Sequence, residues 1–208
     1  SDNATLINEP RFAPTGVQAP KSKSDLAFTM HMLSWLSTEG TAAIVEFPGV
    51  LYRGGAEQKI RKYLIDNNYV DTVIQLPQNL FFGVSIATCI IVLKKSKKEN
   101  KTLFIDASQL FVHEGNKNKL SPENIDAIVT EFAERRKVKH FSALIDNRIV
   151  AENNYNLSVS SYVEAEDTRP KIDIKELNEH IRKIVAHENK LRTEIDKIIA
   201  ELENETAV

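Results

Sequence analysis

The chain has 208 residues, of which 42% are hydrophobic and 27% are charged, as in ordinary globular proteins. This length is enough for one sizeable core, or for one domain with an extension. The net charge of −2 and the pI near 6.2 exclude a protein that is basic overall. Any contact with nucleic acid therefore has to be local or shared with a partner.

The single cysteine, Cys89, lies in the apolar run A-T-C-I-I-V-L, which predicts a buried and inert thiol. One cysteine excludes an intrachain disulfide and is compatible with a reducing cytosol. The sequence shows no signal peptide and no apolar span of membrane length. We therefore expect a cytoplasmic protein. Because the chain starts at Ser1 without an initiator methionine, in loop-like composition, we also expect a piece of a longer protein.

The first part of the chain predicts a strand–helix–strand unit after an opening loop and a helix. The helix over about residues 24–38 carries apolar side chains around most of its circumference, which predicts deep packing. These side chains are Leu26, Phe28, Met30, Met32, Leu33, Trp35 and Leu36. A strand at Thr41–Phe47, a helix after Gly54-Gly55 and a strand at Tyr69–Leu76 follow. We expect a right-handed β-α-β unit of a mostly parallel sheet, preceded by an earlier strand.

A short loop joins Tyr69–Leu76 to a further apolar run, Ser85–Leu93. So short a connection predicts two antiparallel neighbours, and Thr102–Asp106 adds one more strand. The expected fold class is therefore α/β, with an antiparallel hairpin at the edge of the sheet. The loop carries two adjacent aromatics, Phe81 and Phe82, which predict either a functional loop or a ring that caps the core.

Residues 115–119 are predicted to be a polar loop, and residues 139–163 to be irregular with short strands. Between them, Ser121 and Pro122 are typical of a helix start. The expected buried stripe of this helix consists of Ile125, Ile128, Val129 and Phe132.

The C-terminal part predicts one long helix, from about Ile172 to Glu203, after a hinge at residues 167–171. Its apolar residues recur at spacings of three and four, and Glu188 is the one polar break in this heptad seam. They are Ile174, Leu177, Ile181, Ile184, Leu191, Ile195, Ile198 and Leu202. A seam this narrow favours a partner helix, although it could also pack along its own domain. We therefore expect two domains, residues 1–166 and residues 167–208.

Common phosphate-binding, catalytic and metal-binding motifs are absent from the sequence. There is no glycine-rich phosphate loop, no H-E-x-x-H motif and no clustered histidine or cysteine, so no metal site is predicted. Arg53, beside the Gly54-Gly55 turn, could contact a phosphate or lie on the surface. Phe47, Pro48 and Gly49 could line a pocket or simply end their strand.

The exact residue order of several segments is more specific than these patterns. The segments are K-S-K-S-D-L-A-F-T-M-H-M-L-S-W-L, G-T-A-A-I-V-E-F-P-G-V-L-Y-R-G-G-A-E-Q-K-I-R-K-Y-L-I, V-I-Q-L-P-Q-N-L-F-F-G-V-S-I-A-T-C-I-I-V-L-K-K, F-I-D-A-S and N-Y-N-L-S-V-S-S-Y-V. In this order they closely resemble the modification subunit of type I restriction-modification systems. The resemblance implies a DNA methyltransferase that uses S-adenosylmethionine to methylate N6 of adenine on a Rossmann-like sheet. Its implied partners are DNA, a specificity subunit and a restriction subunit.

The resemblance also assigns residues. The family's glycine-rich cofactor motif and its N-P-P-[FY] motif are absent, which implies the C-terminal part of the subunit, inactive alone and without the main cofactor site. An aromatic before the last hairpin strand would stack on the extruded adenine: Phe81, with Phe82 as the near alternative. Phe47, Pro48, Gly49 and Arg53 are the implied substrate-binding residues. Ile181, Ile184, Leu191, Ile195 and Ile198 would dock on the specificity subunit.

Two other functions remain open from the sequence. The chain could be a non-catalytic assembly module that works through its C-terminal helix. Alternatively, methyl transfer could act on another acceptor, such as a protein or N4 of cytosine. The DNA target cannot be predicted, because the family assigns target recognition to the specificity subunit.

Overall fold

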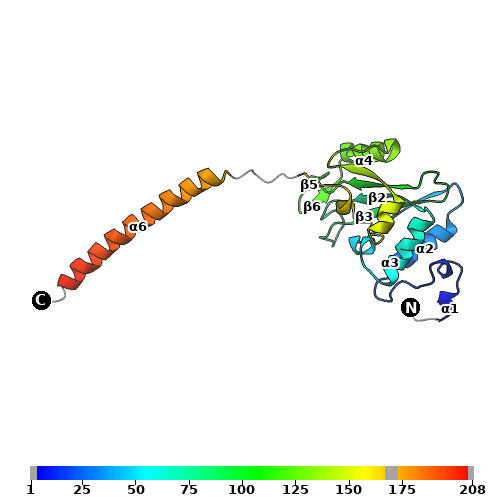
Figure 1. Cartoon of the computed structure of the whole chain (residues 1–208), viewed down its shortest axis with the longest axis horizontal. Helices are drawn as coiled ribbons and strands as arrows, with labels where there is room; N and C mark the ends of the chain where they lie inside the picture. The colour runs from blue at the N-terminus through cyan, green and yellow to red at the C-terminus, as the bar shows by residue number, and fades with distance from the viewer. Residues whose placement is uncertain (1–3, 167–172, 206–208) are drawn as a thin grey trace. The chain divides into compact units, whose positions relative to one another are not determined.

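The structure is a computed structural model that describes residues 4–166 and 173–205 (Figure 1). It divides into two compact units, residues 1–166 and residues 167–208, which we describe separately. The hinge expected at residues 167–171 lies outside the described residues. Among the helices in the described ranges, none has the length and hydrophobicity that a membrane crossing requires.

A five-stranded mixed sheet, with strand order β1-β3-β2-β4-β7, forms the centre of the first unit. Its strands are β1 (Thr41–Glu46), β2 (Val70–Gln75), β3 (Cys89–Lys94), β4 (Lys101–Asp106) and β7 (Ser142–Asp146). The predicted antiparallel pairing of β2 with β3 is confirmed. The predicted α/β fold class with a long C-terminal helix is confirmed as well. The hairpin expected at the edge lies inside the sheet instead, because β1 pairs with the free side of β3.

The prediction of a mostly parallel sheet was wrong. Only β2 and β4 pair in parallel, whereas β1–β3, β2–β3 and β4–β7 are antiparallel. β1 and β2 run in the same direction, but β3 lies between them, and Ile91 of β3 is in register with both Ile44 and Val73. The apolar run of β3 is buried along most of its length, and a strand in the interior of a sheet satisfies its backbone groups on both edges.

Helices cover both faces of the sheet. α2 (Asp25–Trp35), α3 (Ala56–Asp66) and α5 (Asn147–Glu152) share one core with Val73, Ile91 and Phe104. α4 (Pro122–Glu134) covers a second core with Ile74, Leu103 and Ile105. Adjacent strand residues thus alternate between the two cores, as the pleat requires. Each fully buried aliphatic or aromatic side chain contributes roughly 1.5–3 kcal/mol.

The first helix is less buried than its sequence predicts. Leu26, Met30 and Leu33 of α2 are buried, whereas Phe28 is 63% and Trp35 is 79% exposed. α2 packs against β1, which is the last strand of the described sheet on that side. No further strand of the described ranges lies beyond β1, and Phe28 and Trp35 remain exposed on α2.

Several shorter helices and strands differ from the predicted ones. α4 begins where expected, with a capping box between Ser121 and Asn124, but Ile125 and Val129 of its predicted stripe are exposed. The predicted loop at residues 115–119 belongs to a hairpin of β5 (Val112–Glu114) and β6 (Lys117–Lys119). Residues 139–163 contain β7 and α5. The remaining short helices are α1 (Ala4–Ile7), η1 (Ala13–Thr15), η2 (Pro48–Leu51) and η3 (Val159–Ser161).

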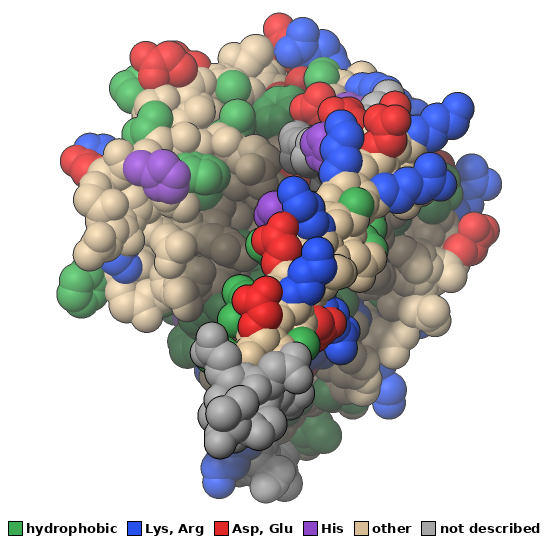
Figure 2. Space-filling model, turned by 90° about the vertical axis from the view of Figure 1, so that its left-hand side faces the viewer, with side chains coloured by type: hydrophobic (Ala, Val, Ile, Leu, Met, Phe, Trp, Pro, Cys, Tyr) green, Lys and Arg blue, Asp and Glu red, His purple; other side chains and the backbone are tan. Residues whose placement is uncertain are grey.

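The second unit contains one helix of 32 residues, α6 (Ile174–Glu205), close to the predicted range. At a rise of 1.5 Å per residue it is about 48 Å long. Its seam residues are 46–71% exposed. Figure 2 shows charged side chains of both signs along this helix, with hydrophobic side chains between them.

Candidate functional site

One edge of the sheet brings the candidate residues into the same region. Cys89, at the start of β3, is in register with both Glu46 and Gln75, and Gln75 is also in register with Asp106. The carboxyl ends of β1, β2 and β4 therefore lie at a common edge, where open α/β sheets bind their ligands. Three connections leave this edge: residues 47–55, residues 76–88 and residues 107–111.

The connection from Leu76 to Thr88, which we call the aromatic loop, projects two phenylalanine rings. Its base is closed because Leu76 N donates to Thr88 O over 2.9 Å. Gly83 turns the chain with a φ of 73°, a conformation that glycine adopts without strain. Phe81 is 39% and Phe82 is 97% exposed. Neither ring belongs to a buried core cluster, so both are accessible in this structure.

The hairpin of β5 and β6 is hydrogen-bonded to the aromatic loop. Asn118 donates from its backbone to Asn79 O over 3.0 Å and from its side chain to Gln78 O over 2.8 Å. Lys117 donates through Nζ to Phe81 O over 2.9 Å, and Nζ lies 5.4 Å from the centroid of the Phe82 ring. The sequence did not predict these residues, because β6 consists of three polar residues and so has no hydrophobic period.

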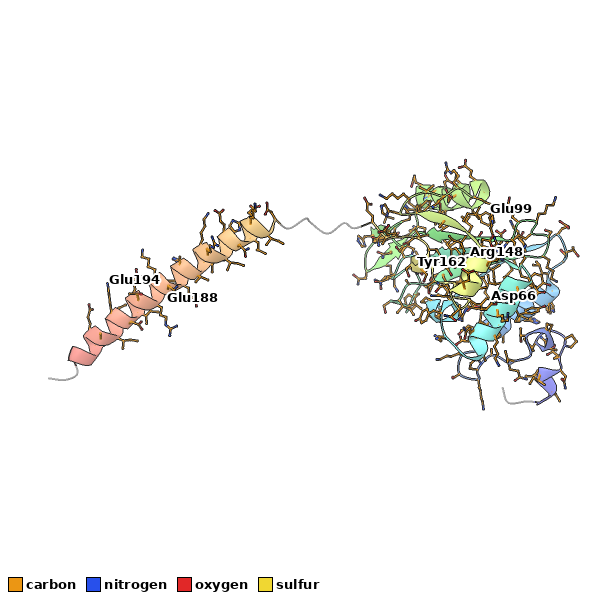
Figure 3. The ribbon with its side chains drawn as sticks, viewed as in Figure 1. Asp66, Glu99, Arg148, Tyr162, Glu188 and Glu194 are labelled. Carbon is orange, nitrogen blue, oxygen red and sulfur yellow. The ribbon has the colours of Figure 1, made fainter. Side chains whose placement is uncertain are left out.

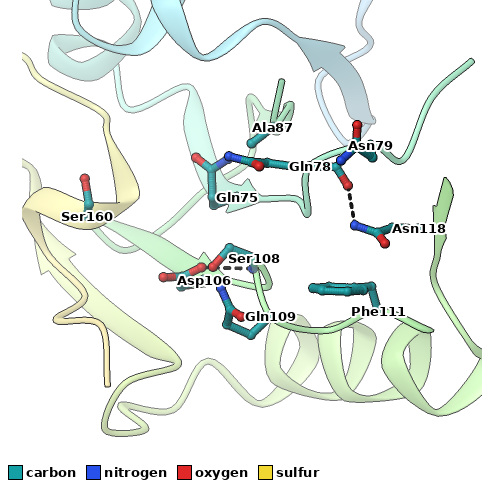
Figure 4. Close-up of a pocket in the computed structure, with 10 residues that line it drawn as sticks. All are labelled: Gln75, Gln78, Asn79, Ala87, Asp106, Ser108, Gln109, Phe111, Asn118 and Ser160. Atoms are coloured by element: carbon teal, nitrogen blue, oxygen red, sulfur yellow. Dashed lines mark hydrogen bonds between the residues drawn. The ribbon is translucent and has the colours of Figure 1, made fainter. Parts of the chain in front are cut away.

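A cavity of about 490 Å³ opens between the aromatic loop, the end of β4 and the hairpin (Figure 4). Amide side chains dominate its lining, and amides both donate and accept hydrogen bonds. Its lining residues are Gln75, Gln78, Asn79, Ala87, Asp106, Ser108, Gln109, Phe111, Asn118 and Ser160. Such a lining suits a polar, uncharged ligand group such as a base edge or a sugar hydroxyl.

The predicted substrate-binding residues after β1 form one local cluster. Phe47 is 43% exposed and precedes the short helix η2, in which Gly49 is buried. A Cβ on Gly49 would collide with the guanidinium of Arg53, which lies across it. Arg53 also pairs with the buried carboxylate of Glu57 at 3.2 Å. Arg53 is therefore anchored within the chain, and its predicted contact with phosphate stays a prediction.

Two buried groups lie directly behind this edge. Glu46 is 6% exposed and accepts a hydrogen bond from Thr29 Oγ1 over 2.8 Å. Burial raises the pKa of Glu46 to about 7, although the Thr29 hydroxyl acts in the opposite direction. Cys89 donates from Sγ to Glu46 O over 3.4 Å, and burial raises its pKa to about 12. The thiol is therefore protonated at neutral pH.

The described residues do not fit a nucleoside cofactor. In α/β sheets such a cofactor lies at a glycine-rich strand-to-helix turn, with an acidic residue at the end of the next strand. Gly54-Gly55 precedes α3, but β2 ends at Gln75 and not at Asp or Glu. Among the described side chains, no three of His, Cys, Asp or Glu are grouped to hold a metal ion.

This mixed sheet, with its ligand edge and aromatic loop, has the fold of Rossmann-like methyltransferases. The methyltransferase subunit of a type I restriction-modification system from Streptococcus thermophilus superimposes with a TM-score of 0.77 at 41% identity, over 79% of this chain and 35% of that one. The N-6 DNA Methylase family matches residues 1–171. The chain belongs to this family.

Curated relatives support the same assignment. The MpnII methylase subunit of Mycoplasma pneumoniae is 48% identical over 96% of this chain and 37% of its own length. The MjaVII methylase subunit of Methanocaldococcus jannaschii is 33% identical over 90% of this chain and 33% of its own length. Both are type I restriction enzyme subunits, so the predicted resemblance is confirmed. The chain spans about a third of the length of these relatives.

Proposed function

We propose that this chain is part of the DNA methyltransferase subunit of a type I restriction-modification system. The subunit transfers the methyl group of S-adenosylmethionine to N6 of adenine in DNA. Membership of the N-6 DNA methylase family and 48% identity to a type I methylase subunit support this proposal. Residues outside this chain hold the cofactor, and this chain alone is inactive.

The observation that carries the proposal is the aromatic loop at the carboxyl edge of the sheet. An adenine inside a duplex is out of reach, so it has to leave the stack at a cost of a few kcal/mol. Stacking on an aromatic ring returns about 1–3 kcal/mol. Phe82 is 97% exposed and Phe81 is 39% exposed, in a loop held at its base and by the hairpin. This loop stacks the extruded base.

The amide-lined cavity lies at the base of the same loop. We infer that its amide side chains contact the nucleotide that carries the extruded base. Phe47, Pro48, Gly49 and Arg53, which follow β1 at the same edge, line the opposite side of the substrate site. Catalysis then rests on positioning of the adenine amino group against the methyl donor.

The test replaces each aromatic residue in the intact subunit. Phe81→Ala and Phe82→Ala should lower the methylation rate about 10- to 100-fold, the equivalent of one lost stacking contact, with cofactor binding unchanged. Phe82→Tyr should keep most of the rate, because its ring stacks equally well. Ile149→Ala, which removes an exposed apolar side chain of α5, is the control.

Unaltered methylation by both alanine variants would contradict the proposed base stacking. If both alanine variants methylate hemimethylated DNA at the unaltered rate, the loop does not hold the base. Methylation-sensitive sequencing of host DNA identifies the acceptor atom. N4-methylcytosine, or no modified base at all, would replace the adenine assignment with one of the two alternative functions.

We also propose that α6 docks on the specificity subunit, and that the restriction subunit joins them in the full nuclease. The support is an exposed apolar seam on a helix that forms a unit of its own. The contact residues are Ile181, Ile184, Leu191, Ile195 and Ile198, each of which is 46–67% exposed. A cytoplasmic location is part of the same proposal.

A further inference from the structure

The seam of α6 contains one charge, at its centre. Four apolar seam residues precede Glu188 and four follow it, in an unbroken spacing of three and four. In heptad notation Glu188 occupies an a position, together with Ile181 and Ile195, whereas Ile184 and Leu191 occupy d positions. Glu188 lies near the middle of the helix (Figure 3).

No partner within the described helix neutralises this carboxylate. The ion pair described on α6 joins Lys190 and Glu194, at 4.0 Å, and leaves Glu188 out. Arg192, one turn further on, forms no described ion pair with it. Glu188 is exposed in this structure, but any helix that covers the seam would bury its carboxylate among isoleucine and leucine side chains.

Pairing of α6 with a second copy of itself is therefore disfavoured in every register. In a parallel, in-register pair the two Glu188 side chains face each other, and like charges at a seam repel. In an antiparallel pair a positions face d positions, so each Glu188 would meet Ile184 or Leu191. A shift by one heptad would place it against Ile181 or Ile195. A buried carboxylate without a counter-charge is strongly destabilising.

We infer that α6 selects a helix of a different chain, which presents a Lys or Arg opposite Glu188 in an otherwise apolar seam. Glu188 is then a specificity-determining residue: it excludes self-association and accepts a basic partner. The inference deepens the proposed assembly function, on which it rests for the identity of the partner. Charge complementarity at one central a position is a known way to fix the partner and the register of a helix pair.

The experiment measures partner choice directly. Labelled peptides of residues 173–205, with the native sequence or with Glu188→Lys, are titrated with the full chain and followed by fluorescence anisotropy. The native chain should bind the Glu188→Lys peptide at least about tenfold more tightly than the native peptide. The full chain carrying Glu188→Lys should reverse this preference. Circular dichroism checks that each variant keeps its helix content.

Two further variants make the test specific. Glu179→Lys makes the same charge change on the outer face of α6, at an f position, and should leave the preference unchanged. Glu188→Leu completes the apolar seam, so this chain should dimerise in sedimentation equilibrium at concentrations where the native chain is monomeric. Equal binding of both peptides, or a native chain that dimerises as readily as Glu188→Leu, would overturn the inference.

Binding to the purified specificity subunit separates this inference from the proposed function. If Glu188→Lys keeps that binding while the peptide preference holds, the inference stands and the seam serves another basic helix. If Glu188→Lys loses the specificity subunit while the peptides show no preference, assembly through α6 stands and the inference fails. If Glu188→Lys loses the specificity subunit and the peptide preference holds, both the assembly role of α6 and the selection by Glu188 are supported.

Discussion

At the scale of single residues, burial brings the pKa of Glu46 close to neutral pH. Glu46 ends the edge strand β1, is 6% exposed, and is hydrogen-bonded by the Thr29 hydroxyl. Burial raises its pKa from 4.5 to about 7. The folded state therefore binds a proton more tightly than the unfolded state does. The stability linked to this group is fully present below about pH 4.5 and is lost as the pH rises to about 7.

Glu46→Gln should remove this pH dependence. The amide keeps an acceptor for Thr29 and carries no charge, so the variant should be more stable than the native chain at pH 8, by up to roughly 3 kcal/mol. At pH 4.5 the two proteins should differ little. Urea unfolding at both pH values measures the effect. Glu39→Gln, at an exposed position, is the control, and the same gain at both pH values would contradict the prediction.

At the scale of elements, the hairpin of β5 and β6 is a support for the aromatic loop. The hairpin contributes three hydrogen bonds to that loop, from Lys117 and from the backbone and side chain of Asn118. None of its strand residues belongs to a core cluster, and the residues of β5 are exposed. Its removal should therefore affect the position of the phenylalanine rings more than the stability of the domain.

Lys117→Ala and Asn118→Ala in the intact subunit should each lower kcat/KM for DNA about 5- to 20-fold, since each removes one side-chain hydrogen bond to the aromatic loop. The unfolding midpoint and cofactor binding should change little. Lys119→Ala, in the same strand, is the matched control, because Lys119 pairs only with exposed Glu114 among the described residues. If Lys119→Ala lowers kcat/KM equally, the loss results from the change in surface charge. The hairpin then does not position the aromatic loop.

A second element-scale feature is the open side of β1 and α2. β1 ends the described sheet, and Phe28 and Trp35 of α2 are exposed on that side. Exposed aromatics beside an unpaired strand edge are typical of a surface that another structural element covers. We therefore propose that further strands of the intact subunit pair with this edge.

At the scale of the whole molecule, the chain divides into two compact units. Both core clusters consist of residues before position 167. A chain that ends at Glu166 should therefore keep the thermal midpoint of the first unit within about 2 °C, because it loses no core contact. It should no longer co-purify with the specificity subunit.

The control for that truncation keeps the full length of the chain. Ile184→Asp with Ile195→Asp, in the seam, should abolish specificity-subunit binding, whereas Ala186→Asp with Ala200→Asp, on the outer face, should not. If the chain ending at Glu166 still binds with full affinity, the contact lies elsewhere and α6 has another task.

Local patterns were sufficient for much of this protein. The apolar runs predicted β1, β2, β3 and β4, Ser121-Pro122 predicted the start of α4, and the heptad spacing predicted α6. The residue order of the quoted segments predicted the family. Each of these features depends on residues close together in the chain, where backbone and side-chain preferences act directly.

The tertiary structure alone decided the strand order and the site. That β3 inserts between β1 and β2 depends on pairing between distant segments, which no local period encodes. The same holds for the contact of Lys117 and Asn118 with the aromatic loop, and for the burial that raises the pKa of Glu46. Hydrophobic periodicity specifies which side of an element is buried, but long-range packing determines which groups meet.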